Sequence, residues 1–227
     1  MIFPSLDRVK AIAPGYDIVP VYMEILSDVR TPISVLKALK QVSSHTYLLE
    51  SADNSNHWGR YSFLGYDPKI ELFCKNHKMT IKDGTTRTFE CSDPAAEIRN
   101  ILSQYKSPRL EELPTFTGGF VGYFTCEYIR YIEPTLDFPT PDDDSAMVND
   151  VDLMLFDKVI AFDHYKNKIY LIANISTNDL ERNYNKAELE LKALADLVVN
   201  GKEADIPKGI LKTEFTSEFT KDEFEAV

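Results

Sequence analysis

The sequence predicts an α+β fold in which antiparallel β-sheet packs against helices. Segments with helical periodicity alternate with groups of consecutive strand-like segments along the 227 residues. The pair Asp83-Gly84 between two strand-like runs is typical of a tight hairpin turn, which makes antiparallel neighbours. Two later strands are apolar almost throughout, which indicates a sheet covered on both faces. Helices packed on antiparallel sheet account for all three observations.

The first part of the chain is expected to contain two helices separated by a strand. Ser5 is placed to cap a short helix, which Pro14-Gly15 ends before a strand from Val19 to Leu26. Thr31-Pro32 marks the next helix start, because proline at the first helical position loses no hydrogen bond. The apolar stripe of this second helix consists of Val35, Leu36, Leu39 and Val42.

The middle of the chain adds strands and a third helix. A strand from Ile70 to Cys74 precedes the hairpin from Met79 to Phe89. Asp93-Pro94 then opens a helix, whose expected stripe is Ile98, Ile101, Leu102 and Tyr105. The glycines that follow lack the spacing of a nucleotide-binding loop, so we interpret Gly118, Gly119 and Gly122 as positions of close packing.

The last third is expected to form an acidic loop, two strands and the longest helix. Residues 133–149 are rich in proline and aspartate but lack the pattern of a calcium loop. Strands from Val151 to Phe162 and from Lys168 to Ile175 flank a turn from His164 to Asn167. Apolar residues then recur at helical spacing before Gly201, and these are Leu180, Tyr184, Ala187, Leu191, Leu194 and Val198. Residues 202–217 are expected to be a linker.

Composition excludes several functional classes. A formal net charge of −11 without a visible basic patch disfavours binding to nucleic acid or to an anionic membrane surface. No segment has the length and apolarity of a signal peptide or of a membrane span. The cysteines, Cys74, Cys91 and Cys126, are widely spaced with no CxxC pair, so neither a zinc site nor a disulfide framework is expected. A cytoplasmic protein fits these features best.

Polar residues stand where a buried strand should be apolar throughout. The strand that begins at Tyr47 is followed at once by Glu50 and Ser51, and the turn comes only later, from Asp53 to Asn56. A second strand, from Tyr61 to Leu64, follows Arg60, so the two strand ends can pair antiparallel. We therefore expect a carboxylate, a hydroxyl and a guanidinium to converge there.

Two ordered sequence blocks identify a family. The run Leu-Leu-Glu-Ser (48–51), followed by Trp-Gly-Arg-Tyr-Ser-Phe-Leu-Gly (58–65), resembles the N-terminal region of anthranilate synthase component I. The block Thr-Gly-Gly-Phe-Val-Gly-Tyr-Phe (117–124), with Glu-Tyr-Ile-Arg-Tyr (127–131) behind it, matches the same family at the expected distance. The large component of aminodeoxychorismate synthase is a close relative.

The resemblance implies a domain division. Residues 1–218 would form the regulatory N-terminal region, with half of the family's two-sheet sandwich. Residues 219–227 resemble the truncated start of the chorismate-binding catalytic domain, where Thr220 and Glu223 make a capping box.

The resemblance also implies an activity for the full-length protein, the formation of anthranilate and pyruvate from chorismate. That reaction uses Mg²⁺, whose ligands would lie outside this chain, and ammonia supplied from glutamine by an amidotransferase subunit, component II. No catalytic residue is assigned here, and the fragment alone is expected to be inactive and to bind no cofactor.

The family's regulatory tryptophan site falls on the interrupted strands. Ser51 and Glu50 are the first contacts by resemblance, and the third falls on Arg60 or Tyr61. A glutamate can pair the ammonium of an amino acid, a serine can hydrogen-bond it, and apolar strand residues can enclose an indole. The alternative is that Glu50 and Ser51 merely satisfy buried backbone groups at a strand end.

Two other functions remain open at this stage. The chain resembles the N-terminal part of aminodeoxychorismate synthase of the folate pathway as well, where tryptophan is held structurally. It could also be a free-standing amino-acid-binding module that never joins a catalytic domain, although the helix that begins at Thr220 favours an enzyme.

Overall fold

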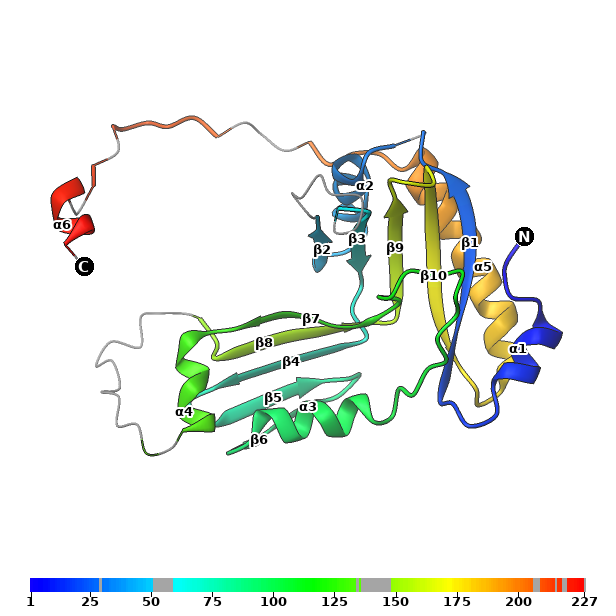
Figure 1. The fold of residues 1–227 in the computed structure, drawn as a ribbon, viewed down its shortest axis with the longest axis horizontal. Coiled ribbons are helices and arrows are strands. Elements are labelled where there is room, and N and C mark those ends of the chain that lie inside the picture. Colours follow the sequence, from blue (N-terminus) through cyan, green and yellow to red (C-terminus); the bar gives the residue numbers. More distant parts are fainter. Residues whose placement is uncertain are drawn as a thin grey trace.

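Two five-stranded antiparallel sheets, with helices packed on them, form the molecule (Figure 1). The computed structural model of the chain describes residues 1–28, 30–50, 59–133, 135, 148–205, 209–214, 216–217 and 220–226. The α+β class predicted from the sequence is confirmed. The strands divide between two sheets, called sheet A and sheet B below.

Sheet A carries the two strands that hold the predicted site. Its order is β1-β10-β9-β3-β2, formed by Ile18–Leu26, Lys168–Ser176, Lys158–Asp163, Tyr61–Tyr66 and Thr46–Leu49. Helices α1 (Leu6–Ile12), α2 (Pro32–Leu39) and α5 (Leu180–Asn200) bury apolar residues in one core with one face of this sheet. Leu110 and Leu113, from the loop after the third helix, pack in the core on its other face. Both faces are therefore covered, as the apolar strands predict.

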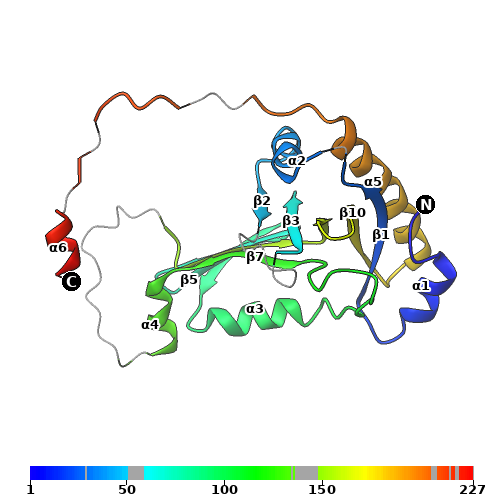
Figure 2. The same ribbon diagram turned by 45° about the horizontal axis from the view of Figure 1, so that its top comes forward.

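Sheet B also has five strands, but fewer helices pack on it. Its order is β6-β5-β4-β8-β7, formed by Thr86–Glu90, Lys78–Lys82, Ile70–Lys75, Val151–Phe156 and Gly119–Phe124. Helix α3 (Pro94–Leu102) lies along one face (Figure 2), where Ile98 and Ile101 pack against the core of the sheet. A short helical segment, η1 (Cys126–Tyr128) and α4 (Ile129–Ile132), follows β7.

The single strand predicted from Val151 to Phe162 is divided in the structure. Its first part, β8, pairs with β4 in sheet B, and its second part, β9, pairs with β3 in sheet A. Asp157 separates the two parts. Its carbonyl oxygen accepts hydrogen bonds from the backbone N–H and the side-chain amide of Asn174, at 2.9 and 3.1 Å. Apolar periodicity continues through such a crossing, because both parts are buried.

The second helix is shorter than its apolar pattern predicts. It has the expected start, since Thr31 and Ser34 form a capping box. The side-chain oxygen of each residue accepts a hydrogen bond from the backbone N–H of the other. It ends at Leu39, and Val42 lies beyond it with an exposed side chain. Similarly, α3 ends at Leu102, so Tyr105 is outside the helix.

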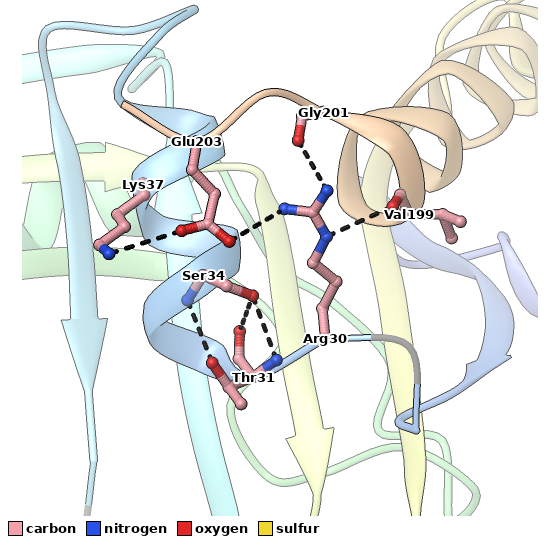
Figure 3. Close-up of polar contacts among 7 residues, drawn as sticks. All are labelled: Arg30, Thr31, Ser34, Lys37, Val199, Gly201 and Glu203. Atoms are coloured by element: carbon pink, nitrogen blue, oxygen red, sulfur yellow. Dashed lines mark hydrogen bonds and ion pairs between the residues drawn. The ribbon is translucent and has the colours of Figure 1, made fainter. Parts of the chain in front are cut away.

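A polar cluster ties the C-terminus of α5 to α2 (Figure 3). Arg30 donates to the carbonyl oxygens of Val199 and Gly201 at 3.3 and 2.8 Å, and its third nitrogen lies 3.5 Å from Glu203. Lys37 of α2 pairs with the same carboxylate at 3.4 Å. Arg30 thereby satisfies carbonyl groups that a helix end leaves without intrahelical partners.

Among the described residues, no helix is long and apolar enough to span a membrane. The capping box predicted at Thr220 and Glu223 is present at the start of α6 (Lys221–Glu225).

Candidate functional site

The predicted site lies at one end of the β2–β3 pair. The register pairs Thr46 with Tyr66 and ends with Leu49 opposite Phe63. Glu50 comes directly after the last pair and is exposed to solvent. Arg60 immediately precedes β3, so the antiparallel pairing brings Glu50 and Arg60 to the same end of the two strands. Ser51 and the predicted turn from Asp53 to Asn56 lie outside the described residues.

A cross-strand aromatic contact fixes β2 on the sheet. Tyr47 pairs with Gly65, and a Cβ atom added at Gly65 would collide with the Tyr47 ring. The same ring meets Phe156 edge to face, with 4.7 Å between the centroids. Only glycine lets a neighbouring side chain lie this close to the backbone. This packing holds β2 against β3, three residues before Glu50.

Arg60 is bound to a partner that the sequence did not indicate. Its Nε and Nη2 atoms donate to the two carboxylate oxygens of Asp163, at 3.0 and 2.7 Å. Asp163 ends β9 and pairs with Tyr61 across the sheet. Two parallel charge-assisted bonds of this kind fix both the distance and the orientation of a guanidinium group.

The Asp163 carboxylate is buried and fully occupied. The residue has 0% exposed surface, and its Oδ1 atom also accepts the backbone N–H groups of Tyr165 and Lys166. Burial acts to raise the pKa of this carboxyl group. The hydrogen bonds from Arg60 and from the Lys166 backbone outweigh burial, so the net pKa lies below the ordinary value. Asp163 is therefore ionised at neutral pH.

Aromatic rings cover the guanidinium of Arg60. Its central carbon lies 4.8 Å from the Tyr61 ring centroid and 5.6 Å from that of Tyr165. Tyr61 also packs against Phe63, with ring centroids 5.7 Å apart. Positively charged groups over aromatic faces gain about 0.5–2 kcal/mol, depending on how far they are removed from water. The predicted residues Arg60 and Tyr61 are thus in contact with each other.

On the neighbouring part of β3, Ser62 forms a short contact with a histidine. Its Oγ atom lies 2.7 Å from Nε2 of His164, which follows β9 in the turn and is exposed to solvent. The pair looks like a nucleophile and base, with Asp163 next in the chain. Yet Ser62 is only 3% exposed, and the carboxylate of Asp163 binds Arg60 and the turn. This arrangement is structural and does not form a catalytic triad.

The chemistry of the strand end suits a small ligand that carries both a negative and a positive group. A guanidinium has five N–H donors, and the bonds to Asp163 use two of them. The outer Nη1 and Nη2 donors form a second parallel pair that can bind a carboxylate. Glu50 can bind an ammonium group. No group of three His, Cys, Asp or Glu side chains within the described ranges could hold a metal ion.

The chain is an α+β protein of two antiparallel sheets with a charged and aromatic cluster at a strand end. Its sequence is similar to those of known proteins. No family model matches it. It is 36% identical to anthranilate synthase component 1 of Acetivibrio thermocellus, over 86% of this chain and 39% of that protein. The same protein of Acinetobacter calcoaceticus is 39% identical over 81% of this chain and 37% of its own length. That of Aquifex aeolicus is 31% identical over 98% and 46%.

One solved structure, anthranilate synthase component I from Streptococcus pneumoniae, matches 74% of this chain and 36% of its own, with 26% identity and a TM-score of 0.45. The sequence matches confirm the resemblance to anthranilate synthase component I over most of this chain. It spans less than half the length of these relatives.

Proposed function

We propose that the chain is the regulatory N-terminal part of an anthranilate synthase component I in tryptophan biosynthesis. Residues 1–218 form this part, and residues 219–227 begin the chorismate-binding domain. The observation that carries the proposal is sequence identity of 31% to a named component I over 98% of this chain. The complete enzyme converts chorismate to anthranilate and pyruvate, with ammonia from a glutamine amidotransferase subunit.

The catalytic groups of the complete enzyme belong to another part of the protein in this proposal. Among the described residues, no group of three His, Cys, Asp or Glu side chains could hold Mg²⁺. The 227-residue chain supplied with chorismate, Mg²⁺ and ammonia should form no anthranilate. Fluorescence detection of anthranilate checks this, and steady turnover by the isolated chain would contradict the domain assignment.

The strand end acts as part of a feedback site for tryptophan. Glu50 binds the ammonium of the amino acid, Arg60 binds its carboxylate, and Ser51 supplies one further hydrogen bond. Tyr61 lines the cluster beside Arg60, and their contact at 4.8 Å supports a common role. A ligand changes activity only through different affinity for the active and inactive arrangements. A site between the regulatory and catalytic parts of the complete enzyme would suit that role.

Replacing Ser51 by phenylalanine tests the regulatory assignment. Loss of one hydrogen bond to a polar ligand costs about 1–3 kcal/mol, or roughly ten- to a hundredfold in affinity, and the added ring also occupies ligand space. The complete Ser51→Phe enzyme should keep nearly normal turnover but lose inhibition by tryptophan. Titration of the initial rate with tryptophan measures this. An unchanged inhibition constant would place the regulatory site elsewhere.

The identity of the product completes the test. Anthranilate as the product supports the proposal, whereas aminodeoxychorismate would assign the chain to the folate-pathway relative.

A further inference from the structure

We propose that Asp163 is a positioning residue for ligand recognition at the end of the β2–β3 pair. By binding one edge of the Arg60 guanidinium, Asp163 fixes the orientation in which the outer edge receives the carboxylate of an amino-acid ligand. This inference rests on the proposed function, since it deepens the role of Arg60 in the tryptophan site. Asp163 itself does not touch the ligand.

The bonding pattern separates two edges of the guanidinium. Asp163 takes Nε and one hydrogen of Nη2, which are the parallel donors along the side of the group. The other two parallel donors lie at the tip of the group, on Nη1 and Nη2. The structure records no hydrogen bond from them to a described residue. The Arg60 side chain is 31% exposed, so a ligand can reach it from solvent. A planar group held along its side presents its tip in a fixed direction.

The surroundings of Arg60 leave it little freedom. Tyr61 and Tyr165 contact the guanidinium at 4.8 and 5.6 Å, and Asp163 is itself fixed by two backbone N–H groups of its turn. An arginine side chain that moves freely on a protein surface loses considerable rotamer entropy when it binds a ligand. Here that loss has already occurred on folding, so less free energy is lost on binding.

Charge acts in the opposite direction and makes the idea testable. The negative charge of Asp163 weakens the attraction between Arg60 and an incoming carboxylate. If orientation dominates, removing that charge weakens binding. If charge dominates, removing it strengthens binding. The sign of the change therefore distinguishes a positioning residue from a residue that only neutralises Arg60.

Asp163→Asn is the central variant, because it changes little else. The amide oxygen can still accept the N–H groups of Tyr165 and Lys166, but the amide nitrogen cannot accept from Arg60 Nη2. Arg60→Ala and the double variant complete a cycle, and Arg60→Lys keeps the charge without the two parallel bonds. Glu24→Gln is the matched control, since it removes the neighbouring ion pair of Glu24 with Lys168, at 2.6 Å.

The measurements are the inhibition constant for tryptophan and kcat/KM for chorismate, both in the complete enzyme that carries this chain. We expect Asp163→Asn and Arg60→Lys to raise the inhibition constant roughly tenfold, and Arg60→Ala ten- to a hundredfold. Adding Asp163→Asn to Arg60→Ala should change it no further. Glu24→Gln should leave it as in the wild type, and kcat/KM should stay unchanged in the control.

Each other outcome is decisive. An unchanged or lower inhibition constant for Asp163→Asn overturns the inference while tryptophan regulation stands. An equal effect of Asp163→Asn with and without Arg60 also overturns it, because Asp163 then does not act through Arg60. Should Asp163→Asn fail to fold, an Arg60→Lys enzyme with wild-type inhibition overturns it instead. A wild-type enzyme that tryptophan does not inhibit refutes the proposed regulation, and the inference with it.

Discussion

Asp163 joins three parts of the chain through one buried carboxylate. It ends β9, accepts the N–H groups of the following turn and holds Arg60 before β3. Because the hydrogen bonds lower its pKa in the folded state, its ionised form stabilises the fold. A group of this kind contributes fully above the pKa of the unfolded chain, about 3.9, and loses its contribution as the pH falls through the folded value.

Urea unfolding of wild type and Asp163→Asn from about pH 7 to about pH 3 tests that linkage. The asparagine does not titrate, so the difference in unfolding free energy isolates the carboxylate. We expect a constant advantage of the wild type above about pH 5 that shrinks toward lower pH. A difference independent of pH down to about pH 3 would contradict the assignment.

Gly65 is the residue that admits the Tyr47 ring. The ring also packs edge to face against Phe156, which limits how far it can move when a methyl group is added. Overpacking of this kind costs about 1–3 kcal/mol. Gly65→Ala should therefore lower the unfolding free energy of the chain by that amount. Gly209→Ala, where nothing lies within 4 Å of an added Cβ, is the control and should be close to neutral. Equal stabilities of the two variants would contradict the packing argument.

The candidate site was only partly predictable at this scale. Glu50 and Arg60 were recognisable because charged residues directly adjoin apolar strand segments, and antiparallel pairing alone predicts that they meet. Asp163 stands 103 residues from Arg60 in the chain and at the end of an apolar run, next to an expected turn. A single sequence holds no signal that pairs the two, because their contact depends on β3 lying beside β9. Whether Ser51 joins them stays a prediction.

Among the elements, helices and strands were predicted better than their ends. The apolar pattern located β8 and β9 but joined them, since residues on both sides of Asp157 are buried in different cores. Likewise Val42 fits the spacing of α2, but the helix stops at Leu39 and leaves it exposed. Periodicity reports which residues are apolar, whereas the positions where a strand changes sheets are set by long-range contacts such as Asn174 with Asp157.

The junction of α5 with α2 depends on the side chain of Arg30. Arg30 binds two carbonyl groups at the end of α5, and its side chain is only 17% exposed. Hydrogen bonds from a charged donor contribute about 1.5–3 kcal/mol, so Arg30→Ala should lower the unfolding free energy by about that much. The amide of Ala204, bonded to the carbonyl of Lys37, should then exchange its hydrogen faster.

Lys37→Ala is the matched control for Arg30. It removes only the more exposed ion pair with Glu203, which is worth less than about 1 kcal/mol. Equal losses of stability in the two variants would show that the ion pairs, rather than the capping of α5, hold the junction.

At the scale of the whole molecule, the two sheets are joined twice. The chain passes from sheet A to sheet B between β3 and β4, and from sheet B to sheet A between β8 and β9. In each sheet the two crossing segments pair with each other, β3 with β9 and β4 with β8. The two connections between the sheets therefore leave from strands that are hydrogen-bonded neighbours in each sheet. The strand end with Arg60 lies on β3, one of these connecting strands.

Apolar side chains at the far end of sheet B predict self-association of the chain. Phe124 at the end of β7 is 49% exposed, and Ile129 and Ile132 on α4 are 40% and 60% exposed. Figure 1 shows β7 leading directly to this segment. Exposed apolar residues that gather in one place drive association, because burying them removes apolar surface from water. Sedimentation velocity should show dimers or larger species that increase with protein concentration.

Substitutions on this segment decide whether it causes the association. Phe124→Ser with Ile132→Ser should restore a monomer, since both side chains are already in contact with water and their loss costs little folding stability. Tyr165→Ser removes an aromatic residue at the other sheet that is more exposed, at 74%, and is the control, so it should associate as the wild type does. A wild-type chain that stays monomeric at the highest concentration, or a double variant that associates unchanged, would show that this surface does not bind a second copy.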